Sequence, residues 1–106
     1  MHFFAYQIAA QKTAIYPEAA KITYPALGLA GEVGEVCNKI KKITRDGLSK
    51  DDIRSDLAKE LGDILWYLSA LAHDLDISLE NLAEQNLEKL KARKERGTLQ
   101  GSGDNR

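Results

Sequence analysis

Four acidic residues form two pairs of equal spacing in otherwise apolar stretches of the chain. Glu32 and Glu35 stand three residues apart, and Glu60 and Asp63 repeat that spacing. Residues three apart on a helix lie on one face, so each pair directs two carboxylates the same way. Two such helices packed antiparallel would bring four carboxylates together. Oxygen ligands of this kind, with no thiolate among them, suit Mg²⁺ or Mn²⁺.

The surroundings of these acids carry more information than their spacing. With 16 Asp and Glu residues in 106, chance alone gives about two helical acid pairs of this spacing, and the chain contains two. Within 26–38 and within 60–72, however, the paired acids are the only charged residues. Carboxylates crowded among apolar residues repel one another unless a cation joins them. We therefore expect a bound Mg²⁺, with Mn²⁺ as an alternative, and phosphate chemistry, because protein-bound Mg²⁺ commonly keeps positions for substrate phosphates.

The elements that must position these acids are helices. Apolar residues recur at intervals of three and four throughout the chain, and strand signals are scarce, which predicts an all-α protein. Short connections between the last three helices favour antiparallel neighbours, so we expect a four-helix-bundle-like architecture. The expected helices cover residues 3–15, 25–46, 50–73 and 79–96.

Local signals mark the ends of these helices. Ser49 with Asp52 resembles a capping box, and Ser78 is the expected cap of the last helix. Gly47 and Gly97 are the expected stops. One domain is therefore expected over residues 1–96, followed by a flexible tail at 97–106. The glycines of the first acidic stretch, Gly28, Gly31 and Gly34, are expected to let the two helices approach closely.

Composition restricts the partners. The formal net charge is −1, which offers no broad basic surface for a nucleic-acid polymer. No apolar run is long enough for a membrane helix, and the lone Cys37 cannot form an internal disulfide, so we expect a cytoplasmic protein with no membrane partner. Residues 64–72 are apolar on almost every side, which predicts a homo-oligomer, dimer or tetramer, that buries this surface.

The acids and their neighbours resemble a known family. The pattern Glu-x-x-Glu followed by Glu-x-x-Asp, within YPALGLAGEVGEVCNKIKK and ELGDILWYLSALA, is similar to the signature of the MazG-like all-α nucleoside triphosphate pyrophosphohydrolases. The resemblance covers about residues 6–93. It implies cleavage of a (deoxy)nucleoside triphosphate between the α- and β-phosphates, giving a monophosphate and pyrophosphate, as nucleotide-pool housecleaning. The implied metal ligands are Glu32, Glu35, Glu60 and Asp63.

Proton transfer and phosphate binding need further groups. Glu32 or Glu35 is the expected general base, and the sequence does not choose between them. Lys39 and Lys42 continue the stripe of Glu35 and are expected to reach a polyphosphate. Tyr67, one turn after Asp63, resembles a nucleotide-binding tyrosine of the dCTP-specific relatives.

Two groups of residues complete the predicted substrate site. On the last helix, the positions that resemble the family's phosphate and sugar contacts are Asn86, Lys89 and Arg93. The candidates for the wall of the base pocket are Phe3, Tyr6, Gln7 and Tyr16.

Two other functions remain open at this point. A non-catalytic helical module could use the acids to bind a regulatory metal or organise a dimer. A phosphohydrolase acting on another pyrophosphate compound would keep the site and change the substrate.

Overall fold

The computed structural model describes all 106 residues and contains four α-helices and no β-strand. The elements are α1 (Phe3–Gln11), the 3₁₀ turn η1 (Glu18–Ala20), α2 (Thr23–Asp46), α3 (Lys50–Asp74) and α4 (Leu79–Arg96). The all-α prediction is confirmed. No helix is both long and apolar enough to cross a membrane.

Helix α1 is four residues shorter than predicted. The Thr13 hydroxyl donates a hydrogen bond to the Ala10 carbonyl (2.7 Å). A side chain thus satisfies one of the carbonyls that have no partner at the end of a helix. Pro17 then disfavours helical backbone in the residue before it. The chain crosses from α1 to α2 through η1.

Local sequence explains the limits of the other helices. At the start of α3, the Ser49 hydroxyl accepts from the Asp52 N–H (3.3 Å) and the Asp52 carboxylate accepts from the Ser49 N–H (2.8 Å), which confirms the capping box. The Ser78 hydroxyl caps α4. Gly47 and Gly97 end α2 and α4 in the left-handed region, with φ of 69° and 73°, where glycine has no steric penalty.

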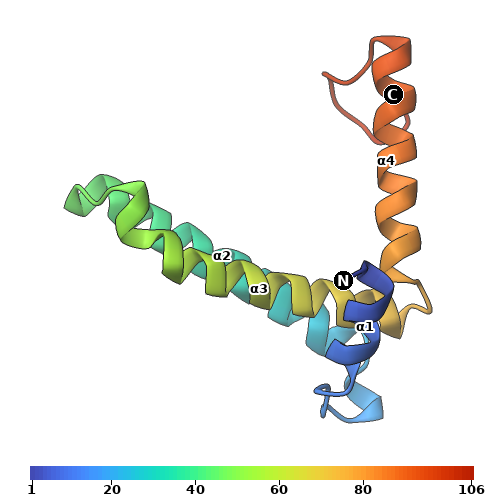
Figure 1. Cartoon of the computed structure of the whole chain (residues 1–106), viewed down its shortest axis with the longest axis horizontal. Helices are drawn as coiled ribbons and strands as arrows, with labels where there is room; N and C mark the ends of the chain where they lie inside the picture. Colours follow the sequence, from blue (N-terminus) through green and yellow to red (C-terminus); the bar gives the residue numbers. More distant parts are fainter.

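Helices α2 and α3 form a long antiparallel hairpin, which is the framework of the molecule (Figure 1). Gly28 of α2 lies under the ring of Tyr67 of α3, and a methyl group at this glycine would overlap the ring. A methyl group at Gly31 or Gly34 would meet no atom within 4 Å. The expectation that the glycines allow close helix approach therefore holds for Gly28 alone.

The Gln7 side chain fastens α1 to the connection between α3 and α4. Its amide nitrogen donates to the carbonyls of Ser69 (3.2 Å) and Ile77 (3.1 Å), and its oxygen accepts from the Leu79 N–H (2.9 Å). Gln7 is buried, and buried polar groups are costly unless they are paired. Its amide is thus committed within the fold and does not take the base-contact role predicted for it.

Helix α4 leaves the hairpin at a wide angle instead of packing along it (Figure 1). The connection from α3 contains Asp76 in the left-handed region, with φ of 59°. The short connection therefore turns the chain outward, where an antiparallel return was expected. The radius of gyration is 16.6 Å, compared with about 13 Å for a compact domain of this size.

The open shape leaves a large apolar surface in water. Leu27, Leu61 and Leu87 are 69%, 56% and 67% exposed. The accessible surface is 7748 Å², whereas a compact monomer of this mass exposes roughly 5,900 Å². The excess of roughly 1,900 Å² is the area that one subunit of an obligate homodimer buries.

We expect this surface to be covered by copies of the same chain in solution. Sedimentation equilibrium at micromolar concentration should give two or four times the mass of one chain, which is 11.7 kDa. A mass of 11.7 kDa at every concentration would contradict the homo-oligomer.

Replacing Gly28 by alanine tests the helix contact. Gly28→Ala should lower the free energy of unfolding by about 1–3 kcal/mol, because the added methyl group must displace the Tyr67 ring. The matched control, Gly31→Ala, should raise it by up to ~1 kcal/mol through helix propensity, since its methyl group meets open space. Denaturant titration measures both, and equal effects would contradict the close contact at Gly28.

Candidate functional site

Three of the four predicted metal ligands converge where α2 and α3 pack together. Glu32 comes from α2, and Glu60 and Asp63 come from α3. Each offers one carboxylate oxygen, and these three oxygens all lie within 4.8 Å of one another. Glu32 and Glu60 are half-buried and Asp63 is exposed. The antiparallel hairpin therefore brings carboxylates distant in sequence to one point.

The carboxylates interact strongly. The pKa of Glu32 is raised to about 7, first by a hydrogen bond with Glu60, then by desolvation and by the charges of Glu60 and Asp63. The same hydrogen bond, followed by that with Lys39, lowers the pKa of Glu60. Glu32 and Glu60 thus share one proton near neutral pH.

Lys39 is the nearest cation to this cluster. Its Nζ lies 3.1 Å from Glu60 Oε1, and its side chain is 28% exposed. The hydrogen bond to Glu60 raises the pKa of Lys39, so the ammonium stays charged. Lys39 offsets one of the three negative charges, and once the shared proton leaves, the remaining charge fits a divalent cation such as Mg²⁺.

Glu35, the fourth predicted ligand, lies outside this group of oxygens. It is exposed on α2, one turn after Glu32. Its charge is a smaller contribution, after those of Glu60 and Asp63, to the raised pKa of Glu32. Glu35 is therefore close enough to affect the cluster, and its role as a ligand stays a prediction.

An aromatic row, defined as Tyr16, Tyr24 and Tyr67, borders the cluster. The rings of Tyr16 and Tyr24 stack with centroids 4.8 Å apart, and those of Tyr24 and Tyr67 are 6.2 Å apart. Desolvation, a hydrogen bond with Tyr24 and then the charges of Glu32 and Asp63 raise the pKa of Tyr67. Tyr67 thus lies beside the carboxylates, on the side predicted for it.

Sequence reasoning missed Tyr24 and Asp74. The Asp74 carboxylate accepts from the Tyr16 hydroxyl (2.9 Å) and from the Ile22 N–H (2.9 Å), which fixes the row at the start of α2. Desolvation and then this hydrogen bond raise the pKa of Tyr16 to about 12. Tyr24 had a usable signal, because it lies one helical turn before Gly28. Asp74 had none, since its partners are more than 50 residues away.

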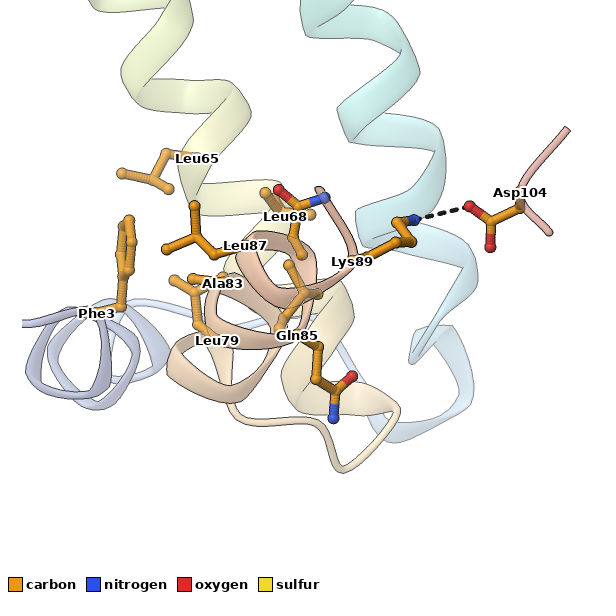
Figure 2. A pocket seen from close by; sticks show the side chains of 11 residues that line it. Phe3, Leu65, Leu68, Leu79, Ala83, Gln85, Leu87, Lys89 and Asp104 are labelled. Atoms are coloured by element: carbon orange, nitrogen blue, oxygen red, sulfur yellow. Dashed lines mark hydrogen bonds and ion pairs between the residues drawn. The ribbon is translucent and has the colours of Figure 1, made fainter. Parts of the chain in front are cut away.

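The other base-pocket candidates, Phe3 and Tyr6, lie next to each other on α1 and face α3. Tyr6 lies beside Phe3 and Leu65, and burial followed by the charge of Asp63 raises its pKa. Phe3 also lines an apolar groove with Leu65 of α3 and Leu79 of α4 (Figure 2).

The basic and amide residues predicted for the substrate are spread over two regions. Lys42 is exposed on α2, beyond Lys39. Asn86, Lys89 and Arg93 lie on α4, which points away from the hairpin (Figure 1). The structure therefore does not bring the α4 residues to the carboxylates within one chain.

Binding of Mg²⁺ should release a proton, because the metal must displace the proton that Glu32 and Glu60 share. The affinity for Mg²⁺ should rise as the pH passes upward through about 7, the raised pKa of Glu32. Calorimetry at neutral pH in two buffers of different ionisation enthalpy measures the released proton. Glu32→Gln should abolish the release, and binding by the unsubstituted protein without proton release would contradict the shared proton.

Comparisons with known proteins point to one family. A family model described as the MazG nucleotide pyrophosphohydrolase domain matches residues 23–98, which include the whole hairpin and α4. The Gene 37 protein of Mycobacterium phage L5 is 50% identical over 114 aligned positions, which cover 100% of both chains. No solved structure matches significantly. Since the family match spans most of the chain and both acidic pairs, the protein belongs to the MazG nucleotide pyrophosphohydrolase family.

Proposed function

We propose that the protein is a Mg²⁺-dependent pyrophosphohydrolase that cleaves (deoxy)nucleoside triphosphates between the α- and β-phosphates. The products are a nucleoside monophosphate and pyrophosphate. The observation that carries this proposal is the convergence of three carboxylate oxygens within 4.8 Å in a chain of the MazG family. Such a set of hard oxygen donors binds Mg²⁺, and Mg²⁺ in turn binds polyphosphates.

The proposed metal ligands are Glu32, Glu60 and Asp63, with Glu35 as the fourth. Glu35 is exposed on the next turn of α2 and is close enough for its charge to act on Glu32. A bound Mg²⁺, or Mn²⁺, would polarise the phosphoryl oxygens and stabilise the leaving pyrophosphate.

The general base is one of the two α2 glutamates. A base works best when its pKa lies near the working pH. Glu32 meets this condition in the metal-free protein, with a pKa of about 7. Glu35 is instead exposed, outside the group of converging oxygens, and free to face a water molecule at the edge of the cluster. The proposal keeps both residues as candidates.

Lys39 and Lys42 are the proposed phosphate contacts on α2. Lys39 is held at the cluster by Glu60, so a phosphate that reaches the site meets an ammonium already in place. Lys42 extends the cationic stripe along α2. Tyr67 is the proposed nucleoside contact, because its ring adjoins the carboxylates and aromatic faces stack with bases.

Incubation of the purified protein with Mg²⁺ and each common deoxy- and ribonucleoside triphosphate tests the reaction. We expect pyrophosphate and a monophosphate from at least one of them. Glu32→Gln and Asp63→Asn should each lower turnover by at least about 100-fold, because each removes a metal-binding charge. Glu84→Gln, an exposed acid on α4 outside the site, is the matched control and should retain full turnover.

Each product pattern has a defined meaning. Release of orthophosphate and a nucleoside diphosphate would contradict cleavage at the α–β position. Mg²⁺ binding with no turnover on any triphosphate would favour the non-catalytic metal-binding module. Unchanged turnover in both acid variants would overturn the site.

A further inference from the structure

The chain enters α2 through a strained turn at Ile22. The Thr23 N–H donates to the Lys21 carbonyl (2.7 Å), and Ile22 between them has φ of 69° and ψ of −57°. These angles define the γ-turn with positive φ, which is a rare and strained form, and a β-branched residue with positive φ is itself exceptional. The Ile22 side chain is 45% exposed, so its burial offsets little of the strain.

Asp74 holds this turn from the end of α3. Its Oδ2 accepts hydrogen bonds from the Ile22 N–H (2.9 Å) and from the Tyr16 hydroxyl (2.9 Å). One carboxylate oxygen thus ties the turn, and the connection between α1 and α2, to the last residue of α3. A strained backbone persists only where the surrounding structure fixes it, and Asp74 supplies the side-chain hydrogen bond that does so here.

Asp74 is poorly suited to a purely stabilising role. Its other oxygen, Oδ1, is buried with no hydrogen-bond partner, which costs free energy. As the last residue of α3, Asp74 also places its carboxylate at the negative end of the helix dipole. Two unfavourable features and a strained turn therefore meet at one point. Such violations of local rules persist mainly at functional sites.

The aromatic row connects Asp74 to the proposed nucleotide site. Tyr16 stacks on Tyr24 with an angle of 22° between the two rings. Tyr24 in turn adjoins Tyr67, the proposed nucleoside contact. Tyr24 is 47% exposed, so the row presents an aromatic surface to solvent beside the carboxylates. Without Tyr16 held in place, the Tyr24 ring would lose its support on one face.

We propose that Asp74 is a positioning residue for nucleotide binding. It fixes Tyr16 and the turn at Ile22, and through the stack on Tyr24 it holds the aromatic surface beside Tyr67 in place for a nucleobase. The inference rests on the proposed function in taking the ligand to be a nucleoside triphosphate. Asp74 lies outside the group of converging carboxylate oxygens, so it affects binding of the base and leaves the chemical step alone.

Calorimetry with the α,β-methylene analogues of the common deoxynucleoside triphosphates, in the presence of Mg²⁺, measures nucleotide binding without turnover. Asp74→Ala should weaken binding of the preferred analogue about fivefold or more, the effect of losing one base stack. Asp74→Asn keeps an acceptor oxygen for the Ile22 N–H and should restore most of the affinity. Asp76→Asn, which removes a neighbouring exposed acid and tolerates positive φ, is the matched control and should leave binding unchanged.

A double variant separates positioning from general stabilisation. Ile22→Gly relieves the strain of the turn, because glycine adopts positive φ without a steric penalty. In this background Asp74→Ala should lose less affinity for the analogue than in the unsubstituted chain, since no strained turn remains to be held. Mg²⁺ affinity without nucleotide should be the same in all these variants. An equal loss in both backgrounds, or a parallel loss of Mg²⁺ affinity, would overturn the proposal.

Turnover gives a separate readout. On a triphosphate that the unsubstituted protein cleaves, Asp74→Ala should raise KM and leave kcat little changed, as expected for a loss of binding alone. If cleavage occurs but Asp74→Ala leaves KM and analogue binding unchanged, the proposed function stands and the positioning role is overturned. If Asp74→Ala weakens analogue binding but no triphosphate is hydrolysed, the positioning role stands and the proposed function is overturned.

Discussion

The packing of α2 on α3 forces like charges together, and the other features of the site follow from this constraint. Glu32, Glu60 and Asp63 repel one another across the hairpin, and the repulsion is relieved by a shared proton and by Lys39. The contact between Gly28 and Tyr67 sets how closely the helices approach. One helix pair therefore determines both the charge of the site and the position of its aromatic border.

The other two helices, α1 and α4, lie at one end of this hairpin (Figure 1). Helix α1 is fixed to the end of α3 by the buried Gln7 amide. Helix α4 extends outward, and its apolar face and that of the hairpin remain in water. This exposed apolar surface is the reason to expect a larger assembly, because burial of apolar surface is the main favourable term in folding.

The predictable features of this protein are those written in short stretches of sequence. The capping box of Ser49 and Asp52 lies within four residues, and the isolation of Glu32 and Glu60 among apolar residues is visible without a structure. The missed features join distant residues. The Gln7 side chain accepts a hydrogen bond from Leu79, 72 residues away, and the Asp74 side chain accepts one from Ile22, 52 residues away. Neither residue type indicates which distant backbone group it will pair with. The connection that turns α4 outward contains Asp76 in the left-handed region, a backbone conformation that sequence pattern does not specify.

The proton shared by Glu32 and Glu60 also bears on the order of assembly. In proteins whose metal ligands repel one another until the metal binds, folding depends on the ion. Here a proton and the Lys39 ammonium occupy the electrostatic role of the metal, and the remaining fold is maintained by helix packing. The helical structure would therefore form without the proposed ion, which would bind to a site already in place. Metal supply would then bear on the proposed activity and not on the amount of folded protein.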